Sequence, residues 1–520
     1  MSGAVLTGTP VSAAPYASAP VTGTAPVSPP PTYAGAPAHV GQPAYPGSPA
    51  YAGPPVAQPA AAPPPAPAPQ RRPFWRSPWV LAAAGALVLA LVATVAVVVL
   101  YRPSRAVEFT TLDPLGTAVP IDDPNSVSYT FSGVSGDRGY VGYVHDKTFK
   151  LGTINLGRGR GPSRTTDVGD ADQWTGLVAF PNGIVITGER DSHGVVYVMN
   201  PDTGAEQFHT DVDRGDHLLA FDAVLVVATD SKGTRGLDWK SGATKWVVPP
   251  LADSSDTRAF GMSTVADLGG PAAFDGTPYA PDLADDTRLL QVTSDKTLRV
   301  YDVRTGRIQG TRLSVGRPDD GYLAHDGTLY AVNTESPYQI QSYALGKLGE
   351  PQIVYTAHDP KRRWRAVTPC GSGRVCLLDS VSSDDKTTEI VAIDVAGHRE
   401  LWRRPAPNAD TLVPVGDRIM ALNVTGEPAA VLYDPDGKQL LKSGDQHAVP
   451  VRITSGSLLL FSESPSSYPT DTSLVGVGSA DGGRTAVGQL TKLRSKACSW
   501  NEQFIVCPTD KEFQAWRFAK

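Results

Sequence analysis

Hydrophobic and polar positions divide the chain into three sections. Residues 80–101 contain one continuous apolar run without a charged side chain before Arg102, and arginines and aromatic residues flank it on both sides. At about 1.5 Å of helix rise per residue, this run covers roughly 30 Å, the thickness of the hydrocarbon core of a bilayer. We therefore expect one transmembrane helix at 80–101. The run is too long, and begins too far into the chain, to favour a cleaved signal peptide.

The section before the apolar run is uncharged up to residue 70 and is rich in Pro, Ala, Gly, Ser and Thr. Such a segment buries too little apolar surface to offset the entropy lost on ordering, so residues 1–70 are predicted to be disordered. A loose Tyr-centred unit recurs in it, which favours either a flexible spacer or a docking strip for an aromatic-groove module. The basic and aromatic segment 71–79 borders the membrane. Its excess of one arginine over the other flank, with Glu108 and Asp113 on that other side and the cysteine pairs described below, places the N-terminus in the cytoplasm.

Residues 102–119 are expected to be a linker, and the chain changes character after it. From residue 120 to residue 520, short runs of Val, Leu, Ile, Tyr and Thr alternate with clusters of Gly, Asp, Pro and Ser. This pattern is typical of antiparallel strands joined by tight turns, so the third section is predicted to be an all-β extracytoplasmic domain.

One unit recurs within this third section. Val196–Gly204 reappears as Leu298–Gly306, and weaker copies lie at 236–242, 390–397 and 431–437. In each unit a strand runs into a turn where Asp or Asn accepts backbone N–H bonds and Gly takes the positive-φ position. After several of these glycines comes an apolar residue that we expect to pack on the neighbouring sheet, namely Phe208, Trp246, Ile308 and Trp402.

Successive units are roughly 40 to 45 residues apart, the length of a four-stranded propeller blade. The strand, the Asp-x-x-Thr-Gly turn and the following apolar or Trp position resemble the repeat of the PQQ-like β-propellers, which include quinoprotein dehydrogenases and BamB-type outer-membrane assembly lipoproteins. The resemblance implies a single propeller over 120–520. Eight candidate third strands, the last in Glu512–Phe518, favour eight blades, with seven as the alternative. No outer strand follows the last, so we expect strands near Gly139–Val144 and Lys150–Leu156 to complete the terminal blade.

The four cysteines form two close pairs, Cys370 with Cys376 and Cys498 with Cys507. Each pair brackets a turn between apolar segments, so a disulfide across one hairpin is geometrically reasonable. An even count and local pairing fit an oxidising compartment. Zinc is the alternative, but neither pair has the two-residue spacing of a zinc knuckle and no His lies nearby at metal-site spacing.

The motifs of common catalytic sites are missing from the sequence. It lacks the nucleophile elbow, the His-Glu-x-x-His zinc motif, the phosphate-binding loop and Cys-x-x-Cys. The dehydrogenases of the resembled family use adjacent cysteines over their quinone, and this chain has none. We therefore expect no cofactor, no metal and no catalysis, and Asp434–Gly437 is interpreted as a turn because it lacks the further ligands of a calcium loop. The net charge of −6 indicates no nucleic-acid partner.

A basic stretch within the propeller is the one candidate binding site. Its residues are Lys361, Arg362, Arg363, Trp364 and Arg365. Four cations around an indole suit contact with a phosphate-rich envelope polymer or a lipid headgroup. The alternative is a solvated loop whose charges are offset by neighbouring carboxylates such as Asp359 and Asp379.

These observations favour a non-catalytic, membrane-tethered propeller that binds a protein or an envelope component. The expected partners are the lipid bilayer through the helix, a protein or envelope polymer at the propeller, and a possible cytoplasmic partner of the tail. One alternative is a receptor that signals through the Pro-rich tail, and another is an enzyme that acts on glycans. The bias toward Ala, Gly, Pro and Arg resembles that of actinobacterial envelope proteins.

Overall fold

The computed structural model describes residues 4–5, 106–124, 127, 129–157, 164–213, 216–229, 233–250, 256–264, 268–272, 287–382, 384–424, 429–442, 448–463, 470–493 and 497–520. The expected tail, apart from Ala4–Val5, and the expected membrane segments 71–79 and 80–101 lie outside these residues. Within the described ranges, no helix has the length and apolarity needed to span a membrane.

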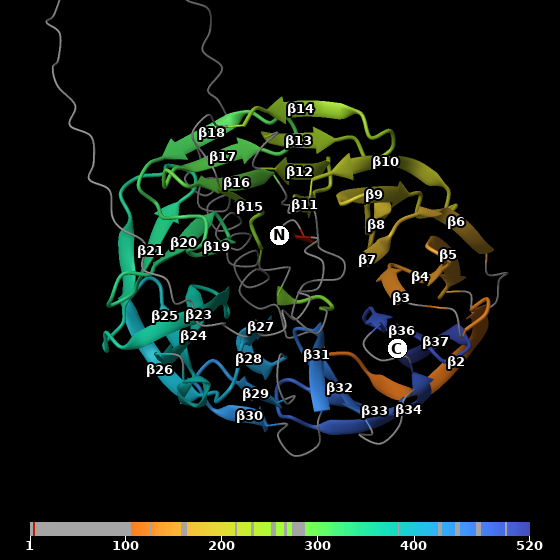
Figure 1. Cartoon of the computed structure of the whole chain (residues 1–520). Helices are drawn as coiled ribbons and strands as arrows, with labels where there is room; N and C mark the ends of the chain where they lie inside the picture. Colours follow the sequence, from red (N-terminus) through yellow and green to blue (C-terminus); the bar gives the residue numbers. More distant parts are fainter. Residues whose placement is uncertain are drawn as a thin grey trace, which may run out of the picture. The chain divides into compact units, whose positions relative to one another are not determined.

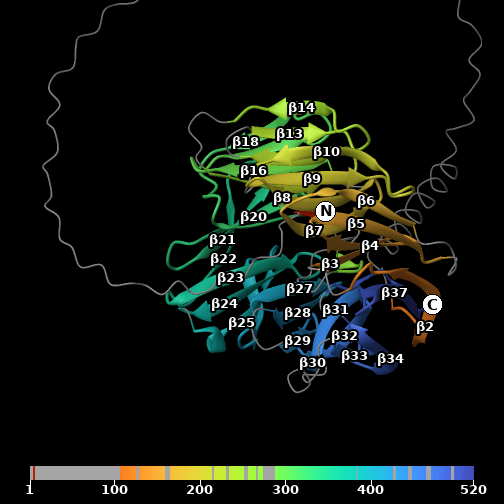
Figure 2. The ribbon, with the colours of Figure 1, turned by 45° about the vertical axis from the view of Figure 1, so that its right-hand side comes forward.

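The described strands from residue 109 onward form nine four-stranded antiparallel sheets arranged as the blades of one ring (Figures 1 and 2). The prediction of an all-β propeller with four-stranded blades is confirmed, but the preferred count of eight blades and the alternative of seven are wrong. Within each blade we call the strands A to D from the centre of the ring outward.

The strands of blades 1 to 3 are β3 (Thr130–Ser135), β4 (Arg138–His145), β5 (Thr148–Asn155) and β6 (Arg164–Asp170); β7 (Gln173–Phe180), β8 (Gly183–Arg190), β9 (His193–Met199) and β10 (Glu206–Val212); and β11 (His217–Ala220), β12 (Leu225–Thr229), β13 (Gly233–Leu237) and β14 (Thr244–Val248). The two-residue strand β1 (Ala4–Val5) pairs with the inner edge of β11.

The strands of blades 4 to 6 are β15 (Thr257–Phe260), β16 (Arg288–Thr293), β17 (Leu298–Asp302) and β18 (Ile308–Arg312); β19 (Gly321–His325), β20 (Thr328–Asn333), β21 (Gln339–Ala344) and β22 (Gln352–Thr356); and β23 (Arg362–Pro369), β24 (Arg374–Val381), β25 (Glu389–Asp394) and β26 (Arg399–Pro405). A short 3-10 turn, η4 (Asp385–Thr387), precedes β25.

The strands of blades 7 to 9 are β27 (Thr411–Val415), β28 (Arg418–Asn423), β29 (Ala429–Tyr433) and β30 (Gln439–Lys442); β31 (Ala448–Thr454), β32 (Ser457–Glu463), β33 (Thr470–Gly478) and β34 (Arg484–Leu493); and β35 (Ser499–Trp500), β36 (Phe504–Pro508), β37 (Glu512–Ala519) and β2 (Phe109–Pro120).

The ring is closed by β2, which lies in the segment 102–119 that we expected to be a linker. It is strand D of blade 9 and pairs with β37, so the two ends of the propeller sequence share one blade as expected. The strands near Gly139–Val144 and Lys150–Leu156 do not complete this blade, because they are β4 and β5 of a separate blade 1. Edge strands tolerate proline, and β2 contains Pro114 and Pro120 in a ladder with two register shifts.

The two ends of the ring carry different connections. Strand A runs from one end to the other, so the A–B and C–D turns lie together at one end and the B–C turns and interblade connections at the other. We call the first end the turn face and the second the connection face. The recurring Asp-x-x-Thr-Gly turns all join strands C and D, and they therefore lie on the turn face.

Apolar residues of adjacent blades form the core, and aromatic side chains of strand D lock one blade to the next. The Trp246 ring lies against the turn glycine Gly306 of blade 4, and its indole N–H donates to Val303 O at 2.8 Å. Phe208 and Trp402 pack on the turn glycines of blades 3 and 7 in the same way. Ile308 departs from the expected pattern.

Ile308 is exposed rather than packed on a neighbouring sheet. The position in β18 that corresponds to Trp246 in β14 is Gly310, as the strand registers show. A Cβ at Gly310 would lie 2.5 Å from the Leu348 side chain, so Leu348 of blade 5 fills the space that an aromatic residue fills elsewhere.

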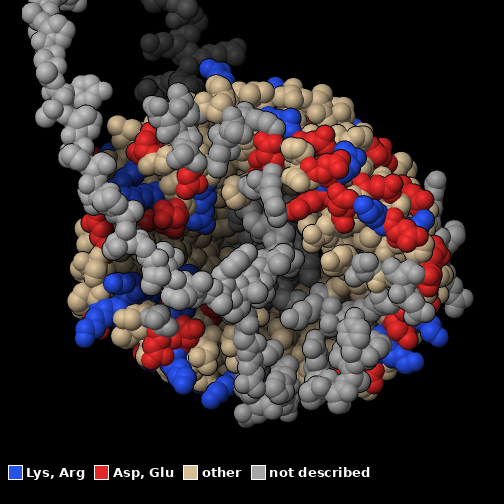
Figure 3. Space-filling view, viewed as in Figure 1, with Lys and Arg blue, Asp and Glu red and all other residues tan. Residues whose placement is uncertain are grey.

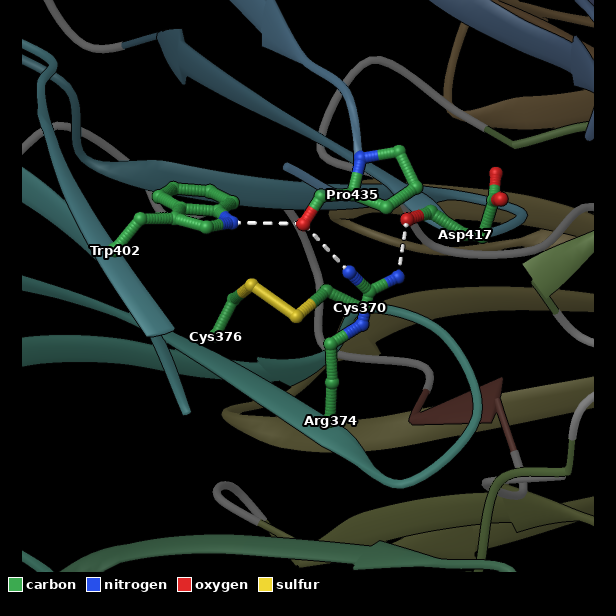
Figure 4. The surroundings of a disulfide bond; sticks show 6 residues. All are labelled: Cys370, Arg374, Cys376, Trp402, Asp417 and Pro435. Atoms are coloured by element: carbon green, nitrogen blue, oxygen red, sulfur yellow. Dashed lines mark hydrogen bonds between the residues drawn. A yellow bond between two sulfur atoms is a disulfide. The ribbon is translucent and has the colours of Figure 1, made fainter. Parts of the chain in front are cut away.

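Both predicted disulfides are present, and both join strand B of a blade to the residues before it. Cys370–Cys376 closes the A–B turn of blade 6, and Cys498–Cys507 joins the residue before strand A of blade 9 to strand B. Figure 4 shows Arg374 leaving the first of these turns toward blade 7. Its guanidinium donates to Pro435 O at 2.8 Å and to Asp417 O at 2.9 Å. The disulfide therefore holds a turn that clamps two blades together.

A long A–B connection in blade 4 crosses the ring on the turn face. Its described residues 261–264 and 268–272, which we call the strap, bond to blades 5, 7, 8 and 9 through Ser263, Leu268, Gly269 and Ala272. Figure 1 shows part of it as a green segment at the centre of the ring. The buried Arg452 of β31 donates to Gly270 O at 2.7 Å. The strap thus joins opposite sides of the ring.

Candidate functional site: the cationic start of β23

The predicted basic stretch lies where the chain enters β23, the inner strand of blade 6, on the connection face. Ladder pairing sets Arg362, Arg363 and Trp364 opposite the end of β24, and a β-bulge at Arg365 interrupts the alternation of side chains. In a regular strand, the side chains of Arg363 and Arg365 would point to the same face of the sheet. The bulge at Arg365 interrupts this alternation, so the two side chains have different surroundings. The five residues therefore divide into two groups with different partners.

Arg362 belongs to a buried charge network with Asp379 at its centre. Arg362 Nη2 and Nε donate to the two oxygens of Asp379 at 2.7 and 2.9 Å, and Arg403 Nη1 donates to Oδ1 at 2.8 Å. Tyr338 of blade 5 donates its hydroxyl to Asp379 Oδ2 at 2.8 Å. Asp379 thus ties strands β23, β24 and β26 of blade 6 to blade 5.

Further carboxylates complete this network around the two guanidinium groups. Glu389 accepts from both Arg362 and Arg403, and Glu400 accepts from Arg403 Nη2 at 3.1 Å. Arg403 Nη2 also donates to the Tyr355 hydroxyl at 3.0 Å. Each buried charge therefore has an opposite charge and several hydrogen bonds, as a buried ion network requires.

The network changes the protonation behaviour of its members. Burial raises the pKa of Tyr338 far above its ordinary value, and the negative charge of Asp379 adds to the effect. Burial also raises the pKa of Tyr355 to about 12, although Arg403 opposes the shift. Burial by itself lowers the pKa of Arg403, but the bonds to Glu400 and the charge of Asp379 outweigh it and raise that pKa. Both tyrosines and the arginine therefore keep their protons at neutral pH.

Arg365 is also occupied by groups of its own blade. Its Nε donates to Ser380 Oγ at 2.7 Å, and its guanidinium pairs with Asp385 of η4. These bonds fix the B–C connection beside β23. Arg362 and Arg365 are thus parts of the scaffold, in agreement with the alternative that neighbouring carboxylates offset the basic stretch.

Lys361 and Arg363 remain as exposed cations without an ion pair to a described carboxylate. Arg363 Nη1 donates only to the backbone oxygens of Pro360 and Arg362. Trp364 is half-buried and packs toward blade 5, where a Cβ at Gly321 of β19 would lie 2.7 Å from its ring. The part of the basic stretch that can contact an anion is therefore the pair Lys361 and Arg363.

The surface charge of the ring is uneven. Figure 3 shows acidic side chains gathered over blade 2, at the upper right of the view. Among residues 171–213, seven carboxylates face a single arginine, Arg190, which pairs with Asp211 at 3.1 Å. Blade 6 has the opposite balance, with nine Lys and Arg against seven Asp and Glu in the described residues of 357–405. A partner with acidic groups is therefore favoured at blade 6 and repelled at blade 2.

Sequence reasoning missed most of the groups that build this site. Asp379 was recognised as a possible neighbour, but Arg403, Glu389 and Glu400 were not. They come from strands C and D, and only the fold brings them to β23. The strap was missed too, although a connection of more than about 12 to 15 residues between strands usually has a role of its own.

Comparison with known proteins shows no family for this chain. No protein-family model matches the chain, and no curated protein matches it. Among solved structures the chain is similar to BamB from Moraxella catarrhalis, with 15% identity, a TM-score of 0.39, and coverage of 79% of this chain and 98% of that chain.

Two further structures show the same kind of likeness. A eukaryotic initiation factor has 10% identity and a TM-score of 0.45, over 75% of this chain and 93% of that chain. A europium-containing methanol dehydrogenase has 10% identity and a TM-score of 0.39, over 79% and 93%. At such low identities and TM-scores, these matches carry no argument about the family or the function of this chain.

Proposed function

We propose that this chain is a non-catalytic, membrane-tethered binding module whose propeller holds an envelope component with acidic groups at the connection face of blade 6. The observation that carries this proposal is the pair of exposed cations Lys361 and Arg363, which form no ion pair with a described carboxylate and lie at the start of a strand that buried ion pairs hold in place. Exposed cations at the start of a firmly held strand suit recognition of phosphate or carboxylate groups.

A binding role also agrees with the way the carboxylates of this site are used. Asp379, Glu389 and Glu400 each accept hydrogen bonds from guanidinium groups, so none of them is presented as a proton acceptor to a substrate. Lys361 and Arg363 form no ion pair with a described carboxylate, so they are available to bind a partner.

The binding test uses the full chain in detergent or nanodiscs with polyphosphate and a poly-glutamate peptide as probes. We expect K361A/R363A to weaken binding of at least one probe about tenfold or more, since each charged hydrogen bond contributes roughly 1.5–3 kcal/mol. The matched control is K438A/K442A, which removes two exposed cations from blade 7. Equal binding by both double variants would contradict the proposed site.

Tethering and topology need a separate test, because the expected helix at 80–101 lies outside the described residues. Ala4–Val5 pairs with β11 of the propeller. A tail that lies on the other side of a bilayer cannot form this pairing within the same molecule. Protease digestion of intact cells and of inverted vesicles, with a tag at residue 2, measures the side of the tail. Protection of the tag in intact cells, together with cleavage of the propeller, is the result expected for a cytoplasmic tail.

A further inference from the structure

A belt of exposed apolar side chains runs along the outer strands of four consecutive blades. Most large apolar residues of the described ranges are buried, and only seven are exposed. Four of these seven lie on strand D of blades 3, 4, 5 and 6: Val247 (59% exposed), Ile308 (57%), Ile353 (50%) and Leu401 (39%). We call these four residues the outer belt.

The outer belt is confined to one side of the ring. In blade 7 the first residue of strand D is Gln439, at the position that Ile308 holds in blade 4. In blades 1 and 2 the corresponding strands begin with Arg164 and Glu206. Strand D runs from the turn face to the connection face. Ile308, Ile353 and Leu401 lie in the first half of their strands and are therefore nearer the turn face.

Unpaired cations accompany the outer belt at the turn face. Lys240, Arg304, Arg307 and Lys347 come from the C–D turns of blades 3 to 5, all are exposed, and none forms an ion pair with a described carboxylate. Most carboxylates of the same turns are already engaged. Asp302 caps its own turn and accepts from the backbone N–H of Arg304 at 3.0 Å. The C–D turns beside the belt therefore present four cations that no described carboxylate pairs with.

The chain enters the propeller at the same face. The first residue of β2, Phe109, pairs with Ala519, the last residue of β37, and Lys520 forms a 2.7 Å ion pair with Glu108. Because β2 is a strand D, this entry lies on the turn face. Phe109 lies only eight positions after residue 101, the end of the expected membrane segment, and eight positions span at most about 29 Å.

We infer that the outer belt and its cations rest on an anionic lipid surface, with the turn face toward the membrane and the connection face away from it. The inference rests on the tethering part of the proposed function. Single apolar side chains set among cations suit a lipid interface. There the apolar side chains insert below the headgroups, and the cations pair with the lipid phosphates. Lipid is favoured over a protein partner because the apolar residues lie one to a blade and do not form a continuous patch.

The test places a fluorescent probe on the belt of the full chain reconstituted in vesicles. All four native cysteines are in disulfides, so single variants I308C and I353C accept an environment-sensitive NBD label. The matched control is Q439C, at the same position of blade 7. We expect blue-shifted emission and quenching by spin-labelled lipids for the two belt positions in vesicles with phosphatidylglycerol, and neither effect for the control.

Charge reversal examines the electrostatic part separately. We expect R304E/R307E/K347E to lose the quenching at position 308, whereas K438E/K442E retains it. The inference is overturned if the label at 308 stays unquenched while the chain remains in the vesicles, which would leave tethering intact. Quenching of all three labels alike would also overturn it. Release of the chain from the vesicles by carbonate would instead refute tethering.

Discussion

Replacing Asp379 with Asn tests whether the buried network holds the cationic site together. Asp379 is completely buried and accepts four hydrogen bonds, three from guanidinium groups and one from Tyr338. Asn retains one acceptor oxygen but turns an N–H donor toward either an arginine or the tyrosine. D379N therefore loses at least two charge-assisted bonds and leaves Arg362 and Arg403 with less negative charge nearby.

The magnitude follows from the burial of the partners. Removing one member of a buried ion pair costs about 3–5 kcal/mol. The side chains of Arg362 and Arg403 are 13% and 20% exposed, so water compensates them in part. We therefore expect D379N to lower the free energy of unfolding by about 3 kcal/mol, at the lower end of that range.

Two other variants calibrate this value. Y338F removes one hydrogen bond to the same carboxylate and is expected to cost about 1.5–2 kcal/mol. R363A removes an exposed cation of the same strand and should change stability by less than about 0.5 kcal/mol. The assay is guanidinium chloride unfolding followed by tryptophan fluorescence and circular dichroism, since a nine-bladed ring need not unfold in one step. A loss below about 1 kcal/mol for D379N would refute the reasoning.

Three further predictions concern turns and pH. Gly306 and Gly327 both have positive φ, but only a Cβ at Gly306 meets a neighbouring blade's indole, so we expect G327A to cost about 1–2 kcal/mol and G306A about 1–3 kcal/mol more in thermal unfolding assays. C370S/C376S opens a seven-residue loop, and chain entropy predicts a loss of roughly 2.4 kcal/mol, measurable by comparison with oxidised wild type, in which both disulfides are closed. The pKa of Tyr355 is raised to about 12, so its contribution to stability is complete below pH about 10 and is lost as pH rises toward 12. An identical pH dependence of the free energy of unfolding for wild type and Y355F above about pH 10 would contradict this last prediction.

The repeat was predictable because its turns are local. Asp302 accepts backbone N–H bonds from Arg304 and Thr305 at 3.0 and 2.9 Å, and Gly306 has a φ of 67°. All the information for this geometry lies within five residues, so it is visible in the sequence. The disulfides were predictable for the same reason, since each closes a short hairpin.

The ninth blade was not predictable from such local signals. After β5 the chain continues with Leu156-Gly157-Arg158-Gly159, which lacks the Asp-x-x-Thr-Gly signature, so blade 1 did not register as a repeat. The strand β2 was hidden because its prolines and Gly116 indicate a loop, and only pairing with β37 makes it a strand. Signals from distant pairing are absent from a single sequence.

The charges of the candidate site could be predicted from the sequence, but their partners could not. The charges of Lys361–Arg365 are plain in the sequence, but which of them remain available depends on partners in β24, β25 and β26. Arg362 and Arg365 are neutralised by those strands, whereas Lys361 and Arg363 are not. The bulge at Arg365 decides the division, and no pattern in the sequence marks it.

The strap explains how the ring stays closed although the β2–β37 pairing that closes it, which we call the seam, is irregular. Blade 9 joins the two ends of the propeller sequence through a β2–β37 ladder with two register shifts, which makes it the natural place for the ring to open. The strap bypasses this seam, because Ala272 accepts from the Trp500 indole of blade 9 at 3.1 Å and donates to Arg452 O of blade 8 at 3.0 Å. Opening the ring at blade 9 leaves these bonds intact only if blades 4, 8 and 9 move together. The strap also occupies part of the turn face, so a partner that needs a free face of the ring is directed to the connection face, where Lys361 and Arg363 lie.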